Sequence, residues 1–89
     1  MKAIVTVVGK DQVGIIASVC TKLAEYSANV LDISQTVMEG YFTMMMVIDV
    51  SGCNVPLAQL CTEMEELGKS KNLSIRVQRE DIFEAMHRI

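Results

Sequence analysis

The sequence predicts an α+β domain in which a four-stranded antiparallel sheet carries two helices on one face. Four segments are β-branched or alternate between apolar and polar residues, and two amphipathic segments have helical spacing. They follow one another as strand, helix, strand, strand, helix, strand. Because 89 residues suffice for one domain with one core, we expect a single domain over residues 1–89, with residues 80–89 as a short amphipathic tail.

The first strand and the first helix flank a loop that contains two glycines. Residues 2–8 are β-branched and almost continuously apolar, which is typical of a covered strand. Residues 13–27 are predicted to form a helix whose apolar stripe consists of Ile16, Val19, Cys20, Leu23 and Ala24. In the loop, Gly9 is expected to turn the chain, and Gly14 to allow close approach of another group. Amides that open the helix would favour an anion, although two glycines can also serve the chain reversal alone.

A β-hairpin is predicted next. Residues 29–38 and 41–50 flank Glu39 and Gly40, a dipeptide typical of tight turns. The first of these strands is expected to alternate strictly, with Val30, Asp32, Ser34 and Thr36 opposite Leu31, Ile33, Gln35 and Val37. The consecutive methionines at 44, 45 and 46 are expected to pack into the core on one face and into an interface on the other.

The second helix and the fourth strand complete the predicted fold. The helix is predicted to be capped at or near Asn54, to have Pro56 in its first turn and to end at Gly68. Its apolar stripe consists of Leu57, Leu60, Cys61, Met64 and Leu67. Residues 73–78 alternate as a strand, with Leu73, Ile75 and Val77 opposite Ser74, Arg76 and Gln78. With right-handed connections, this order gives a ferredoxin-like βαββαβ sandwich, and apolar residues on its open sheet face indicate a further contact.

Composition and charge disfavour several functions. A net charge of −3 with scattered lysines and arginines argues against a nucleic-acid partner. No apolar run approaches the roughly twenty residues of a membrane span, and residues 1–4 lead into a strand, so we expect a cytoplasmic protein with no membrane partner. The content of 51% hydrophobic residues suggests an oligomer. Cys20, Cys53 and Cys61 lack paired spacing, which indicates reduced thiols, buried at 20 and 61 and exposed at 53.

Other uses of this architecture lack the residues that they need. An RNA-binding domain would need aromatic residues on the first strand, and a soft-metal carrier would need paired cysteines where Asp11 stands. A phosphate-cradling enzyme would need an arginine, for which Gln12 is no substitute. We expect His87 at the surface and the acidic residues Glu63, Glu65 and Glu66 in water. Catalytic residues, metal and cofactor are therefore expected to be absent.

The first loop and its surroundings resemble an ACT domain. The residues that carry the resemblance are Gly-Lys-Asp-Gln-Val-Gly-Ile at 9–15, after a first strand, and Asn29-Val30 at the opening of the second strand. Segments 32–36, 41–44 and 82–89 resemble in particular the stand-alone single-ACT family, which is similar to the ACT regions of the glycine cleavage system regulator. The likeness covers the whole chain.

The resemblance implies a non-enzymatic regulatory module that binds an amino acid or a similar small metabolite. It implies a homodimer whose sheets join side by side and which can be part of a higher oligomer, with ligand held between the first loop of one chain and the second strand of the other. Carried over to this sequence, the ligand-binding residues are Asp11, Gln12, Val13, Gly14, Ile15, Asn29, Val30 and Leu31.

Two positions depart from the family pattern. The family often has proline where Val13 stands, so this loop is less rigid. Many amino-acid-binding members have asparagine where Asp11 stands, and a carboxylate there would attract the ligand's ammonium and repel its carboxylate. The alternative is a ligand-free module that docks a regulatory protein through the sheet or through residues 80–89.

Overall fold

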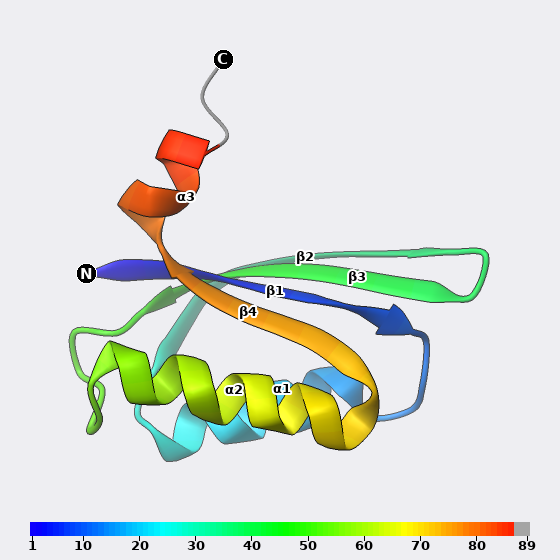
Figure 1. The fold of residues 1–89 in the computed structure, drawn as a ribbon, viewed down its shortest axis with the longest axis horizontal. Coiled ribbons are helices and arrows are strands. Elements are labelled where there is room, and N and C mark those ends of the chain that lie inside the picture. The colour runs from blue at the N-terminus through cyan, green and yellow to red at the C-terminus, as the bar shows by residue number, and fades with distance from the viewer. Residues whose placement is uncertain (87–89) are drawn as a thin grey trace.

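The predicted ferredoxin-like α+β fold is confirmed by the computed structural model, which describes residues 1–86. A four-stranded sheet has the order β2-β3-β1-β4, and each neighbouring pair is antiparallel. Helices α1 and α2 lie on one side of the sheet, and α3 stands on the other (Figure 1). The elements are β1 (Lys2–Lys10), α1 (Ile15–Glu25), β2 (Asn29–Met38), β3 (Tyr41–Asp49), α2 (Leu57–Lys71), β4 (Leu73–Arg79) and α3 (Glu80–Met86).

The core lies between the sheet and the two helices α1 and α2. We call the sheet face toward these helices the inner face and the opposite one the outer face. Met44 and Met46 are fully buried on the inner face, whereas Met45 between them is 38% exposed on the outer face. The prediction that this run contributes to the core is confirmed at two of its three positions, while its use in an interface stays a prediction. The core cluster that contains Met44 and Met46 also includes Val5, Val7, Ile15, Val19, Leu23, Phe42, Ile48, Leu60, Met64, Ile75 and Val77.

The two glycines of the first loop have roles opposite to those predicted. Gly9 does not turn the chain, because β1 continues to Lys10 and Gly9 pairs with Phe42 on one side and Leu73 on the other. A Cβ at Gly9 would lie 2.5 Å from Cδ2 of Leu73, so glycine is needed there for close approach. Gly14 is the turn residue, with φ of 86°. A Cβ there would meet nothing within 4 Å.

The predicted hairpin is confirmed, but strict alternation along β2 is wrong. Val30 pairs with Ile48 and Asp32 with Val47, so Leu31 is an extra residue that forms a β-bulge. The extra residue reverses which side chains face inward after the bulge. Val30 therefore lies on the inner face together with Ile33, whereas Asp32 lies on the outer face. At the turn, Glu39 and Gly40 have φ of 51° and 82°, as a two-residue hairpin turn requires.

Both predicted ends of the second helix are wrong. Helix α2 begins at Leu57 after Pro56, and no side chain caps it. Asn54 instead ties the preceding loop to the end of α1: its side chain donates to the carbonyl of Glu25 at 3.2 Å and its amide to that of Tyr26 at 3.1 Å.

The C-terminal end of α2 lies beyond the predicted glycine. Gly68 is buried inside the helix, which continues to Lys71. Asn72 then adopts the left-handed conformation that ends it, with φ of 58°. Residues 69–71 continue the helix because the conformational penalty of one glycine is small beside the packing of α2 on β4.

The apolar stripes of both helices are confirmed in part. Val19 and Leu23 of α1 are buried, but Ile16 and Ala24 are exposed, and Ile15 takes the first inward position. Helix α1 also begins two residues after the predicted start at Val13. On α2, Leu60 and Met64 are buried, and the other predicted members, Leu57, Cys61 and Leu67, are half-buried against the core.

The predicted C-terminal tail is helical in its described part. Residues 80–86 form α3, while residues 87–89, with the expected surface residue His87, lie outside the described part.

Cys20, Cys53 and Cys61 are unpaired and half-buried, so the prediction of an exposed Cys53 is wrong. Burial raises the pKa of the Cys53 and Cys61 thiols, which favours the thiol over the thiolate. Within residues 1–86, no helix is long and apolar enough to cross a membrane.

Candidate functional site

The first loop is held to three other parts of the chain. The amide of Asp11 donates to the carbonyl of Gly40 in the hairpin turn at 2.7 Å. The Gln12 side chain donates from Nε2 to the carbonyl of Lys71, the last residue of α2, at 2.9 Å. On the other side of fully exposed Val13, the carbonyl of Gly14 accepts from Ser18 in the first helical hydrogen bond. The loop is therefore anchored at both ends with its tip in solvent.

A hollow of about 300 Å³ lies between this loop and β2. Gly14 precedes α1 in the left-handed conformation, and no side chain caps the helix. The first-turn amides of a helix lack acceptors within the helix, and uncapped amides of this kind can donate to a carboxylate or another acceptor. Apolar side chains and one carboxylate complete the wall. The lining residues are Asp11, Gln12, Gly14, Ile15, Ile16, Ala17, Gln35, Val37 and Phe42.

The predicted site residues fall into two groups that one chain does not bring together. Asp11, Gln12, Gly14 and Ile15 line the hollow, and Val13 lies beside it in solvent. Asn29, Val30 and Leu31 lie at the far end of β2, where Asn29 pairs with Asp49. The amide of Gln12, predicted to face a ligand, donates instead to the end of α2.

Sequence reasoning missed several residues that line the hollow. Gln35, Val37 and Phe42 reach it from the hairpin, and Ile16 and Ala17 from α1. The sequence did indicate Gln35, because it is a polar residue on the same face of the strand as the apolar residues Ile33 and Val37. The position of Phe42 depends on its pairing with Gly9, which the predicted turn at Gly9 had excluded.

The edge of β4 that faces away from β1 is contacted by α2. The thiol of Cys61 donates to the carbonyl of Val77 at 3.3 Å. A Cβ at Gly68 would lie 2.6 Å from the carbonyl oxygen of Leu73 and 3.3 Å from the amide nitrogen of Ile75. Since successive residues of a strand point their backbone groups to opposite sides, Leu73, Ile75 and Val77 face away from β1 and toward the helix. Helix α2 therefore lies against part of the β4 edge that faces away from β1.

The other sheet edge, formed by β2, is open in the described chain. In a two-residue hairpin the pair that flanks the turn, here Met38 and Tyr41, is hydrogen-bonded. Alternation from that pair leaves the backbone groups of Ile33, Gln35 and Val37 facing away from β3. The Ile33 and Val37 side chains are 40% and 55% exposed. Such an apolar edge without lysine or proline invites pairing with another strand.

Comparison with known proteins identifies the family. Residues 2–78 match the family model described as the ACT domain. The chain belongs to the ACT-domain family. A UPF0237 protein of Bifidobacterium longum is 52% identical to this ACT-domain protein over 99% of the chain and 98% of its own length. The solved ACT domain protein from Streptococcus pneumoniae is 49% identical, with a TM-score of 0.82 and 98% of each chain covered.

More distant structures share the fold of this ACT-domain protein. One assigned as a glycine cleavage system transcriptional repressor is 24% identical, with a TM-score of 0.74 over 88% of this chain and 44% of its own. The resemblance to the stand-alone family and to the ACT regions of that regulator is confirmed. ACT domains are regulatory modules for small ligands that are found in regulators of amino acid metabolism.

Proposed function

We propose that this ACT-domain protein is a non-catalytic homodimer that binds an amino acid or a similar small metabolite between its two copies. Each site would combine the first loop of one copy, residues 11–15, with the start of the partner's β2, residues 29–31. The observation that carries the proposal is the open apolar edge of β2, since pairing at this edge unites the two groups of residues that one chain keeps apart.

The geometry of two-fold strand pairing supports this arrangement. Antiparallel pairing of β2 with its copy reverses the strand direction, so an axis near Ser34 and Gln35 places the partner's Asn29 beside the hairpin turn. That turn holds the first loop through the hydrogen bond from Asp11 to Gly40. The bulge at Leu31 would then lie close to the hollow, where it can turn a backbone or side-chain group toward a ligand.

The chemistry of the hollow suits a small molecule with both charges. A ligand carboxylate would accept hydrogen bonds from the amides that open α1. An ammonium group would be attracted by the carboxylate of Asp11, and an apolar side chain would contact Ile16 and Val37. Because such a ligand touches both copies, it would bind the dimer more tightly than the monomer. The difference between these two affinities sets how far binding favours the dimer.

The second candidate is a ligand-free module that docks a regulatory protein. It is favoured by the hydrogen bond from Gln12 to Lys71, which already occupies one polar group of the loop. It is also favoured by the exposed apolar residues of the outer sheet face, which the proposed site does not use. The two candidates differ in whether a free amino acid stabilises the folded dimer.

The test is thermal unfolding of the full chain with each of the twenty amino acids. A ligand at a hundred times its Kd adds about 2.7 kcal/mol. For a domain of this size that free energy raises Tm by roughly ten degrees or more. A shift with one chemical class supports the sensor, and no shift in a verified dimer supports the docking module. A monomer in solution would contradict the proposed dimer.

Two glycine variants locate the site. Gly14→Ala adds a Cβ that meets nothing within its own chain, so the variant should fold, but the hollow and the first-turn amides would change. Gly40→Ala is the matched control, because Gly40 also has positive φ, of 82°, and equally open space. We expect Gly14→Ala to lose the ligand shift and Gly40→Ala to keep it. A retained shift in Gly14→Ala would show that the ligand binds elsewhere.

A further inference from the structure

The first loop has no buried side chain to hold it in place. Residues 11–14, between the end of β1 and the start of α1, are all exposed, and Val13 at the tip is fully exposed. The conformation of this segment therefore depends on hydrogen bonds rather than on packing. In residues 1–86, two of its hydrogen bonds reach beyond the neighbouring helix: the backbone bond from Asp11 to Gly40 and the side-chain bond from Gln12 to Lys71.

The group that accepts from Gln12 is at the end of a helix. The last four carbonyls of a helix have no partner within it and carry partial negative charge. At the end of α2, the amide of Asn72 bonds to the carbonyls of Gly68 and Lys69. The carbonyl of Lys71 accepts from Gln12 Nε2 at 2.9 Å. Gln12 thus satisfies one terminal carbonyl of α2 from a position 59 residues away in the sequence.

The strand that leads into the loop contacts the same part of the chain. We call residues 71–73 the α2–β4 connection. A Cβ at Gly9 would lie 2.5 Å from Leu73 Cδ2 and 3.3 Å from the carbonyl oxygen of Asn72. Packing therefore fixes the end of β1 on this connection. Three residues later, Gln12 makes the one side-chain hydrogen bond in residues 1–86 that ties the loop itself to the connection.

We propose that Gln12 is a positioning residue whose bond to Lys71 orders the first loop for ligand binding, and that a bound ligand in turn orders the α2–β4 connection. The inference rests on the proposed ligand site in the hollow, which Gln12 also lines. A loop that is ordered beforehand loses less conformational freedom on binding, so the bond increases affinity. Such coupling is reciprocal, and a ligand that requires the ordered loop strengthens the bond by the same factor.

Backbone NMR relaxation of the ligand-free full chain tests the bond in Gln12→Ala. We expect order parameters of residues 11–14 to fall from about 0.85 in wild type to about 0.6 or below, because the loop loses its side-chain anchor. Gln59→Ala is the matched control, since Gln59 is also exposed but lies in the first turn of α2, at the opposite end from Lys71. Equal loop order in Gln12→Ala, Gln59→Ala and wild type would overturn the inference.

Gln12→Glu separates the hydrogen bond from the size of the side chain. An ionised carboxylate has nearly the same size but no hydrogen to donate, and it would face the partly negative carbonyl of Lys71. Once protonated, it regains one donor. We expect a loop that is mobile at about pH 7 and ordered at about pH 3, below the usual glutamate pKa of roughly 4.3. Gln12→Ala should stay mobile at both, with circular dichroism verifying the fold. Loop order in Gln12→Glu that does not change with pH would overturn the inference.

The effect on binding is tested with a mixture of the twenty amino acids as the probe. Thermal unfolding gives the concentration at which the mixture stabilises each protein. Loss of one hydrogen bond should raise that concentration roughly two- to tenfold in Gln12→Ala and leave it unchanged in Gln59→Ala. The mixture should also slow hydrogen exchange of the Asn72 amide in wild type but not in Gln12→Ala.

Two failures are distinguished by wild type alone. If the mixture stabilises wild type and Gln12→Ala equally, the inference is overturned and the proposed ligand site remains. If the mixture stabilises neither protein, the proposed ligand site is contradicted, and the inference that rests on it falls with it.

Discussion

Gly68 in α2 lies so close to Leu73 in β4 that a Cβ at position 68 would be 2.6 Å from the Leu73 carbonyl oxygen. The backbone of a helix and that of a strand therefore approach each other with no side chain between them. Real Cβ atoms do not come this close to an oxygen, so glycine at position 68 is a packing requirement. The contact also brings α2 over the edge of β4, which leaves β2 as the open edge.

Gly68→Ala should destabilise the fold although alanine favours helices. The added methyl group meets backbone, which cannot rotate away, so α2 must move from β4 and unfolding becomes easier by roughly 1–3 kcal/mol. Urea unfolding followed by circular dichroism measures this difference. Gly52→Ala is the matched control, because a Cβ there lies 3.8 Å from its nearest neighbour, the carbonyl of Ser27. Equal stability of the two variants would show that the close contact has no energetic weight.

Gly9→Ala should be destabilising through one side chain. The Cβ at position 9 would lie 2.5 Å from Leu73 Cδ2, a methyl group that can move only by giving up its place in the core. We therefore expect a coupling between the two positions of about 1 kcal/mol in a double-mutant cycle with Leu73→Ala, measured by urea unfolding. Additive effects of Gly9→Ala and Leu73→Ala would contradict the contact.

The same glycines show how far the sequence predicts this fold. Periodicity and turn composition predict the order of strands and helices, because each element buries a face that its own spacing reveals. A glycine, however, serves either positive φ or close approach, and only the tertiary arrangement distinguishes the two. Gly9 and Gly68 were expected to turn or end an element, but both allow close packing. The bulge at Leu31 was missed because strand periodicity does not reveal an inserted residue.

The candidate site was predictable only in its loop. Asp11, Gln12, Gly14 and Ile15 are contiguous in sequence, and the structure places them around one hollow. Gln35 and Phe42 join them through strand register, which depends on long-range pairing. Asn29 can join them only across two copies of the chain, and that step depends on which sheet edge is open.

Gln35→Pro should disrupt the proposed dimer while leaving each chain folded. Its amide faces the open edge of β2, so proline removes no hydrogen bond within the chain but blocks a partner strand. Ser34→Pro is the matched control, because Ser34 pairs with Met45 and its amide faces β3, so this variant should lose the fold itself. Light scattering gives the mass and circular dichroism the fold. If Gln35→Pro remains folded with the mass of wild type, β2 is not the dimer edge.

The ion pair between Arg79 and Asp81 should give α3 a measurable dependence on pH. Hydrogen bonding to the Arg79 guanidinium lowers the pKa of the Asp81 carboxyl below its ordinary value of 3.8. A carboxylate with a lowered folded pKa contributes stability that is present above the pKa of the unfolded chain and is lost as pH falls through the folded value. The contribution should therefore be complete at neutral pH and disappear in strong acid.

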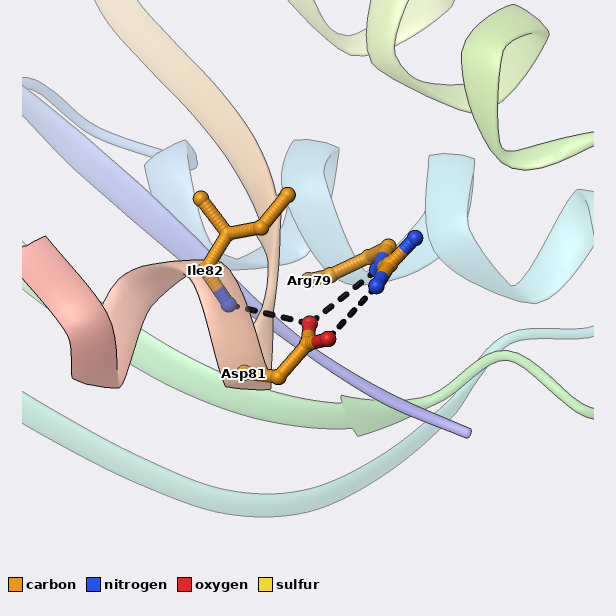
Figure 2. Close-up of polar contacts among 3 residues, drawn as sticks. All are labelled: Arg79, Asp81 and Ile82. Carbon is orange, nitrogen blue, oxygen red and sulfur yellow. Dashed lines mark hydrogen bonds and ion pairs between the residues drawn. The ribbon is translucent and has the colours of Figure 1, made fainter.

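Carboxyl NMR titration of Asp81 measures this pKa directly. In Arg79→Gln it should rise toward 3.8, whereas in Arg76→Gln, three residues earlier on β4, it should stay low. The stability difference between wild type and Asp81→Asn should also shrink as the pH falls below the Asp81 pKa, because both side chains are then neutral. An Asp81 pKa that does not change in Arg79→Gln would show that the pair does not hold α3 in solution. The ion pair that Figure 2 shows would then not hold α3, and the direction of the helix would depend on its packing alone.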